Sequence, residues 1–262
     1  MYLMDYHQHS NHSYNNDKSM QYICEQAIQK GYKEICFTEH YSVNPFTTTY
    51  GHLHFDQYFA EIEFCRGTYS KELTIKTGIE ICEPHVMAEK YELVLNELDF
   101  DVVLGGVHNL HNERISDTIS KYGTAVYSLY FDEVYQMVSK ADIDVIAHLD
   151  LIKHYAFTTT ANYDLNGYEE MLKAILRKAI KRNIGLEINV SSLSTSPADL
   201  APIQKILMLY KEMGGEILTI GSGCGNSQLD VQRIMDGYEL AKSCGFDYVY
   251  KYESRYPKPV EI

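Results

Sequence analysis

Six side chains of the kinds that bind divalent metals follow short apolar segments of this sequence. They are five histidines and one glutamate: His7, His9, His40, Glu80, His108 and His148. The apolar segments before them are residues 2–5, 34–37, 73–79, 100–107 and 143–147, and segments of this length are typical of buried strands. Parallel strands that close into a barrel bring all their C-termini to one face. We therefore expect the six side chains to meet around one small volume.

The strongest local motif is Asp5-Tyr6-His7-Gln8-His9. In an extended segment, positions 7 and 9 point the same way, so their two imidazoles can hold a single ion. Asp5 points to the same face of the strand, and we expect it to hold a neighbouring group in place. The same pattern also occurs at polar strand ends, but its place after the first apolar segment favours a ligand pair.

Glu80 ends a segment that reads as a buried strand, where an unpaired charge is costly. A bridging position between two metals would supply the cations that such a carboxylate needs. Gly105 and Gly106 let the backbone pack closely before His108. Each histidine is ambiguous alone, but five imidazoles and one carboxylate are enough for two or three metals.

Such a cluster suits hydrolysis of a phosphate ester. Two metals can generate hydroxide, bind the phosphoryl oxygens and stabilise the leaving oxygen. No Ser–His–Asp order is evident, and no cysteine motif suited to catalysis is present. Zn²⁺, Mn²⁺ and Fe²⁺ all accept mixed imidazole and carboxylate ligands, so the sequence does not select among them.

Helix-like segments separate the apolar segments and define the architecture. They span residues 19–30, 55–70, 87–98, 122–140, 167–182, 202–213 and 229–243, and two more apolar segments span 184–188 and 216–220. Seven strand–helix repeats predict a parallel sheet with right-handed crossovers in one α/β domain, residues 1–262. A closed or nearly closed barrel is the simplest arrangement. An open doubly wound sheet is the alternative, but its Gly-rich phosphate-binding fingerprint is absent.

Composition limits the classes of partner. The net charge of −13 argues against a broad nucleic-acid-binding surface, although bound metals would still allow an anionic substrate. No apolar stretch approaches the ~20 residues needed to span a bilayer, and the N-terminus does not resemble a signal peptide. We therefore expect a cytoplasmic protein. The six scattered cysteines predict reduced thiols.

Several motifs together resemble those of the polymerase and histidinol phosphatase (PHP) family. They are DYHQHS, FTEH, GIE, GGVHNL, AHLDL and EINVS, in this order over almost the whole chain. The histidinol-phosphate phosphatase branch is the most similar. The resemblance implies a distorted seven-stranded (β/α)7 barrel with a three-metal centre at the C-terminal ends of its strands. It also implies hydrolysis of L-histidinol phosphate to L-histidinol and phosphate in histidine biosynthesis.

The resemblance also implies how the ligands are distributed. His7 and His9 would bind a first metal, and Glu80 would bridge it to a second metal bound by His108 and His148. His40 would help to bind a third. A first-loop histidine often joins the third site in this family, but Asn15 occupies the equivalent spacing here, with His12 nearby.

The last motif departs from the family pattern. The family expects Gly-Ser-Asp-x-His after the seventh strand, and this chain has Gly-Ser-Gly-Cys-Gly at residues 221–225. Gly223 and Gly225 thus replace two expected ligands, and the Cys224 side chain should point away from the metals. This is either a natural member with a reduced or rearranged site or an altered version of an active enzyme. We expect a weakened catalyst.

Candidate substrate contacts follow the motif strands. Lys153 or Arg114 could bind phosphate, Glu83 or Glu113 could bind the amine of histidinol, and His154 lies just beyond a motif residue. Plain surface charges explain these residues equally well. Three alternative functions stay open. One is another PHP-family phosphatase, such as one acting on phosphotyrosine. Another is a nuclease, which the negative net charge opposes, and the last is a non-catalytic ligand-binding barrel, which Gly223 and Gly225 favour.

Overall fold

The computed structural model describes residues 1–153, 155, 165–193, 197–223 and 229–262. Its centre is a parallel sheet of seven strands that follow one another in chain order, β1-β2-β3-β4-β7-β8-β9. The strands are β1 Met4–Gln8, β2 Glu34–Tyr41, β3 Thr74–Cys82, β4 Val102–Gly106, β7 Val145–Ile146, β8 Gly185–Asn189 and β9 Leu218–Gly221. This order confirms the barrel and excludes the doubly wound alternative, in which the strand order reverses.

The barrel is nearly closed between β1 and β9. The Gly223 amide donates a hydrogen bond to the His7 carbonyl at 2.9 Å. The Ser222 amide donates to Oδ1 of Asp5 at 3.0 Å. These bonds join the two edge strands just beyond the end of β9.

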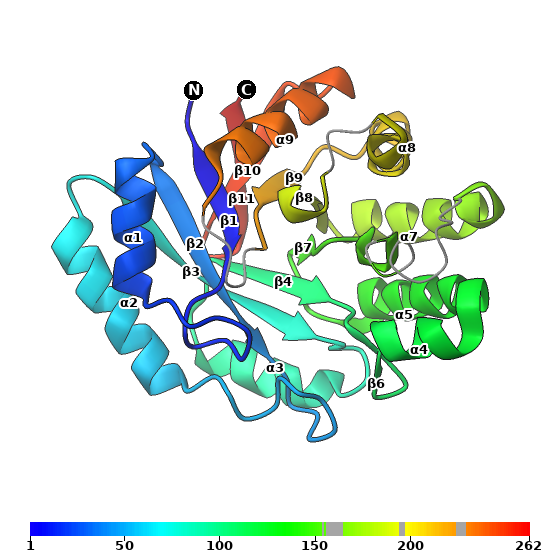
Figure 1. The fold of residues 1–262 in the computed structure, drawn as a ribbon, viewed down its shortest axis with the longest axis horizontal. Coiled ribbons are helices and arrows are strands. Elements are labelled where there is room, and N and C mark those ends of the chain that lie inside the picture. The colour runs from blue at the N-terminus through cyan, green and yellow to red at the C-terminus, as the bar shows by residue number, and fades with distance from the viewer. Residues whose placement is uncertain (154, 156–164, 194–196, 224–228) are drawn as a thin grey trace.

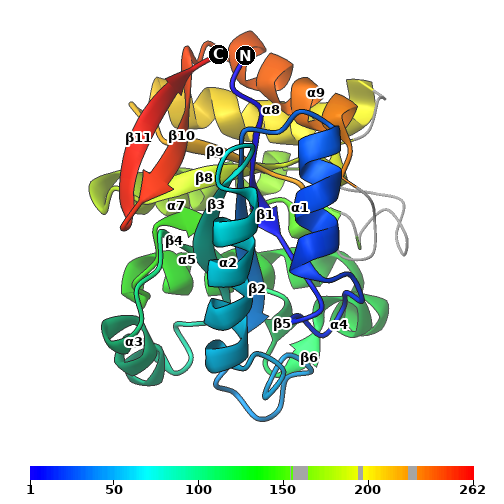
Figure 2. The ribbon, with the colours of Figure 1, turned by 90° about the vertical axis from the view of Figure 1, so that its left-hand side faces the viewer.

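Helices surround the sheet on its outside (Figures 1 and 2). They are α1 Met20–Gln29, α2 Phe55–Tyr69, α3 Ala88–Glu97, α4 Ile115–Tyr122, α5 Val126–Lys140, α7 Glu169–Lys181, α8 Pro197–Glu212 and α9 Val231–Ser243. Side chains cap two of them: Ser19 accepts from Tyr22 N in α1, and Asp230 accepts from Gln232 N in α9. In the part of the chain that the structure describes, no helix is both long and apolar enough to cross a membrane.

Two predicted helices have different bounds in the structure. The helix expected over 122–140 begins only at Val126, as α5, because Tyr122 ends α4 and Gly123 adopts a φ of +60° before a short 3-10 turn. The sequence pattern predicts the second helix over residues 202–213. Instead α8 begins at Pro197 and carries Pro202 inside it.

Two antiparallel hairpins were not predicted. The strands β5 Asn109–Leu110 and β6 Glu113–Arg114 form one, at the end of the molecule away from the termini (Figures 1 and 2). The strands β10 Tyr248–Glu253 and β11 Tyr256–Glu261 form the other. Arg255 anchors this C-terminal hairpin to the N-terminal side of β7 through ion pairs with Asp142 and Asp144. The five cysteines within the described ranges are free and buried, as expected for reduced thiols.

Candidate metal centre

Five strands deliver the six ligand candidates to one place at the C-terminal end of the sheet. His7 lies in β1, His40 in β2 and Glu80 in β3. His9 follows β1, His108 follows β4 and His148 follows β7, each by one or two residues. The structure therefore brings together all six side chains that the sequence singled out.

Glu80 occupies the middle of the cluster and is fully buried. Its Oε2 atom lies 3.1 Å from Nε2 of His7, 3.1 Å from Nε2 of His40 and 3.4 Å from Nε2 of His9. Its Oε1 atom lies 3.1 Å from Nε2 of His108 and 2.8 Å from Nε2 of His148. Burial alone would raise the pKa of the Glu80 carboxyl, but the surrounding imidazoles outweigh it and hold this pKa well below the usual range.

The proton on His7 is placed by a residue outside the predicted set. Nδ1 of His7 lies 2.6 Å from Oε1 of Glu187. A carboxylate only accepts hydrogen bonds, so Nδ1 carries a proton. Burial alone would lower the pKa of His7, but Glu187 and Glu80 outweigh it and raise this pKa well above its ordinary value. Without a metal Nε2 is therefore protonated as well, and a bound metal would take the place of that proton.

His9 is fixed in the same way by a hydroxyl. Nδ1 of His9 lies 3.3 Å from Oγ of Ser13, and this hydroxyl donates its own proton to Glu39 at 2.5 Å. Ser13 can then only accept from His9, which leaves the lone pair of His9 on Nε2. Burial lowers the pKa of His9 well below its ordinary value and that of His40 to about 3. Both imidazoles are therefore neutral near pH 7, which is the form that binds metals.

The spacing of the atoms around Glu80 fits a metal ion. Nε2 of His7 and Nε2 of His9 are 3.1 Å apart, and both face Oε2 of Glu80. Neutral His9 and the carboxylate both direct lone pairs at this point, so a positive charge lies between them, either the proton on His7 or a metal ion. Two nitrogens that bind one Zn²⁺ at ~2.0–2.1 Å in tetrahedral geometry lie roughly 3.3 Å apart, which matches the observed spacing.

The ligand atoms fall into two overlapping groups. His7, Glu80 and His148 form one, and His9, His40 and Glu80 form the other, with the ligand atoms of each group within 4.8 Å of one another. Glu80 belongs to both groups, as expected of a bridging carboxylate. The family resemblance distributes the histidines differently, and which residue binds which metal remains a prediction.

Glu187, in β8, contacts the cluster although the sequence motifs did not predict a role for it. Its Oε1 atom contacts His7, and its Oε2 atom accepts from the His148 amide at 2.7 Å. One carboxylate thereby joins two ligand candidates from β1 and β7. Gly221 makes room for this contact, because a Cβ atom there would lie 2.2 Å from Oε1 of Glu187. The signal was a charged residue within an apolar segment, since a buried carboxylate requires partners.

Asp5 acts on the backbone beside the cluster, in line with the bracing role expected of it. Its Oδ1 atom accepts from the amides of His7 and Ser222, both at 3.0 Å. Gly106 also acts as the sequence suggested: a Cβ atom there would lie 2.5 Å from Cε1 of His108 and 2.6 Å from Oε1 of Glu80.

The end of β9 contributes backbone to the site. Gly223 has a φ of +52°, and a Cβ atom at this position would lie 2.6 Å from Nδ2 of Asn189. An aspartate tolerates this backbone conformation better than most residues, but Asn189 would have to move. Cys224 and Gly225 lie outside the described residues. The first-loop His12 is directed elsewhere and pairs with Glu61 at 2.8 Å.

The five substrate-contact candidates have different surroundings. Lys153 is buried with Nζ 3.7 Å from Asp150, whereas Arg114 and Glu113 are exposed and form ion pairs with Asp117 and Lys121. Glu83 is buried beside His108, and His154 lies outside the described residues. Contact of any of these residues with a substrate remains a prediction.

Comparison with known proteins gives the family and the fold. Residues 5–191 match the PHP domain. The chain is 27% identical over 256 residues to the histidinol-phosphatase of Lactococcus lactis subsp. lactis strain IL1403, covering 94% of this chain and 93% of that protein. The histidinol-phosphatase of Bacillus subtilis strain 168 is 25% identical over 207 residues, covering 68% of this chain and 76% of that protein.

A solved structure has the same fold. It is a histidinol phosphate phosphatase from Lactococcus lactis subsp. lactis Il1403, complexed with zinc, L-histidinol and phosphate. It superposes with a TM-score of 0.87 at 23% sequence identity and covers 98% of this chain and 99% of that chain. The similarity thus extends beyond the residues that match the PHP domain, to β9 and the C-terminal hairpin.

Proposed function

Because this chain belongs to the PHP domain family, we propose that it is a metal-dependent phosphomonoesterase that hydrolyses L-histidinol phosphate to L-histidinol and phosphate. The observation that carries this proposal is the buried Glu80 carboxylate with the Nε2 atoms of five histidines around it. The relatives named histidinol-phosphatase support the choice of substrate. The reaction belongs to histidine biosynthesis, and we assign the protein to the cytoplasm.

Six residues would hold up to three divalent ions, which are Zn²⁺, Mn²⁺ or Fe²⁺: His7, His9, His40, Glu80, His108 and His148. Bound divalent metals supply a hydroxide nucleophile at neutral pH and stabilise the charge on the phosphoryl oxygens. Zinc is present in the related Lactococcus structure.

The protein's own part is to hold the lone pairs of the histidines in place before the substrate arrives. Glu187 and Ser13 keep the protons of His7 and His9 on Nδ1, so both Nε2 atoms face inward. The burial of Glu80 removes this carboxylate from bulk solvent, which strengthens its charge interactions with the surrounding groups. Gly223 and Gly225 lack ligand side chains, which supports a weakened catalyst.

A panel of phosphoesters tests the proposal. Purified protein would be stripped of metal, reloaded separately with Zn²⁺, Mn²⁺ or Fe²⁺, and assayed with L-histidinol phosphate, phosphotyrosine and p-nitrophenyl phosphate. We expect the highest kcat/KM for L-histidinol phosphate. A preference for phosphotyrosine would identify a different phosphatase of the family. Tight metal binding without hydrolysis of any phosphoester would identify a ligand-binding barrel.

A further inference from the structure

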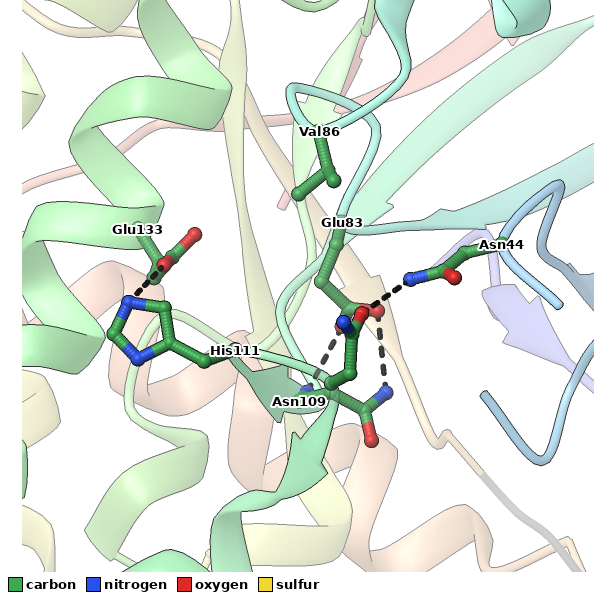
Figure 3. A pocket seen from close by; sticks show the side chains of 7 residues that line it. Asn44, Glu83, Val86, Asn109, His111 and Glu133 are labelled. Atoms are coloured by element: carbon green, nitrogen blue, oxygen red, sulfur yellow. Dashed lines mark hydrogen bonds and ion pairs between the residues drawn. The ribbon is translucent and has the colours of Figure 1, made fainter. Parts of the chain in front are cut away.

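A cavity of about 270 Å³ is lined by Glu83, which follows β3, and by Glu133 of α5 (Figure 3). Its walls come from the loops that follow β2 and β3, from the hairpin β5–β6 and from helix α5. The residues that matter for its chemistry are Asn44, Glu83, Asn109, His111, Asn112 and Glu133. Its volume is near the lower end of the ~300–1,000 Å³ typical of ligand sites, which suits a small molecule.

One imidazole ring separates this cavity from the Glu80 centre. Nε2 of His108 lies 3.1 Å from Oε1 of Glu80, and Nδ1 of the same ring lies 3.9 Å from Oε1 of Glu83. Glu83 lines the cavity, and Glu80 is shared by the ligand groups. The cavity therefore lies one imidazole ring away from the carboxylate that both ligand groups share.

Glu83 is a buried carboxylate with little charge compensation. It is 5% exposed, and its oxygens accept from the amides of His108 and Asn109 and from Nδ2 of Asn109. These donors are neutral. Across the described part of the chain, the ionisable nitrogen found within 4 Å of Glu83 is Nδ1 of His108 at 3.9 Å.

A second carboxylate, Glu133 of α5, lines the same cavity (Figure 3). It pairs with His85 and lies 3.8 Å from Nε2 of His111. The hydrogen bond from His85 lowers the pKa of the Glu133 carboxyl, which keeps it charged. The described lining contains two carboxylates and no lysine or arginine, so the cavity favours a cation.

The rim of the cavity is held in place by a tight turn. His111 and Asn112 connect β5 to β6 with φ values of +52° and +70°, as in the two-residue turns that favour asparagine. The side chain of Asn112 accepts from Nδ2 of Asn44 at 2.7 Å, which ties this turn to the loop after β2.

We propose that this cavity binds the cationic organic end of the substrate, a protonated amine or imidazolium a few atoms from the phosphate, through Glu83 and Glu133. The proposal rests on the proposed function and states how that site selects its substrate. The metal centre would hold the phosphate. Phosphates of uncharged alkyl or aryl alcohols would bind less well, because they leave the buried Glu83 carboxylate uncompensated.

Glu133→Gln tests the proposal, because it keeps the size of the side chain and Glu133 is not buried enough to threaten folding. The exposed neighbour Asp132 gives a matched control, Asp132→Asn, which removes the same charge from the same helix. We expect kcat/KM for L-histidinol phosphate to fall about tenfold or more in Glu133→Gln, since a hydrogen-bonded charge is lost. For p-nitrophenyl phosphate, we expect kcat/KM to change by less than about twofold. Asp132→Asn should change neither.

Calorimetric binding of L-histidinol to metal-loaded protein gives a readout that is independent of turnover. We expect its Kd to rise about tenfold or more in Glu133→Gln. If the wild type prefers L-histidinol phosphate but Glu133→Gln alters neither this preference nor the Kd, the cavity proposal alone is wrong. An equal loss with both phosphoesters would also overturn it, because that pattern indicates damage to the metal centre. If L-histidinol binds through Glu133 but its phosphate is not hydrolysed, the cavity stands and the proposed function fails.

Discussion

The ends of strands β1 to β7 and the end of β9 lie on the same face of the barrel but differ in what they present. The first set presents imidazoles and a carboxylate whose ligand atoms point at one another. The end of β9 presents the backbone of Ser222 and Gly223, which hydrogen-bonds to Asp5 and to the His7 carbonyl. Among the described residues, the candidate metal ligands are thus concentrated on one side of the centre, and Ser222 and Gly223 on the other side close the barrel.

The same comparison shows how the metal-binding side is kept in order. His7 and His9 each donate from Nδ1 to a buried acceptor, Glu187 or Ser13. The described part of the β9 end holds its neighbours through main-chain bonds and the Ser222 hydroxyl. Changes on the metal-binding side should therefore alter metal affinity and activity, and changes at Ser222 should alter stability.

The largest effect is expected from Glu80→Gln. This change removes the one negative charge that both ligand groups share and places an amide among five imidazoles. We expect metal content to collapse and kcat/KM to fall by at least about a hundredfold to a thousandfold. Elemental analysis and a phosphate-release assay would measure both. The exposed Glu92→Gln should leave both unchanged, and a Glu80→Gln protein that retained its metal would contradict the central role of this carboxylate.

Gly106→Ala should disturb the same centre by steric clash, without changing any of the candidate ligands. The new Cβ atom would lie 2.6 Å from Oε1 of Glu80 and 2.5 Å from Cε1 of His108, so at least one of these groups must move. An error of about an ångström in positioning can cost on the order of a hundredfold in rate. Gly67→Ala is the matched control, because a Cβ atom at Gly67 in α2 meets no atom within 4 Å. Normal activity in Gly106→Ala would show that the centre tolerates displacement.

Glu187→Gln should have a smaller effect on metal binding. Glutamine has one acceptor oxygen where glutamate has two, so it cannot accept from both Nδ1 of His7 and the His148 amide. The tautomer of His7 is then no longer fixed. The loss of such a partner typically lowers metal affinity about 10–100-fold. Competition with a chelator would measure this affinity, and thermal unfolding of metal-free protein would separate it from a general loss of structure. Unchanged metal affinity would show that Glu187 does not support metal binding.

Ser222→Ala gives the smallest expected effect and tests the other side of the comparison. The Ser222 hydroxyl is buried and bonds to the Gln8 side chain, so its loss should cost about 1 kcal/mol of unfolding free energy. Chemical denaturation would measure the change, with the exposed Ser120→Ala as control. Metal content should stay the same, and a drop in metal content would assign the end of β9 to the metal centre.

The convergence of the six ligand candidates could be predicted because each follows an apolar segment and parallel strands end on a common face. Glu187 was harder to assign, since its partners His7 and His148 are distant in sequence and the contact depends on the space that Gly221 leaves. The start of α5 was predicted a few residues too early, because Tyr122 and the residues after Gly123 all favour a helix. Each strand of the β5–β6 hairpin has only two residues, too few to show a strand periodicity.

Metal content per chain, measured with turnover of L-histidinol phosphate, tests the central claim most directly. The wild type would be compared with Gly223→Asp/Gly225→His after chelation and reloading. We expect the wild type to retain metal at the Glu80 centre and to turn over slowly. The double variant should hold more metal and work faster, provided that Asn189 yields to the new side chain. A wild-type chain that binds no metal, or that already matches the double variant in metal content and rate, would contradict the account.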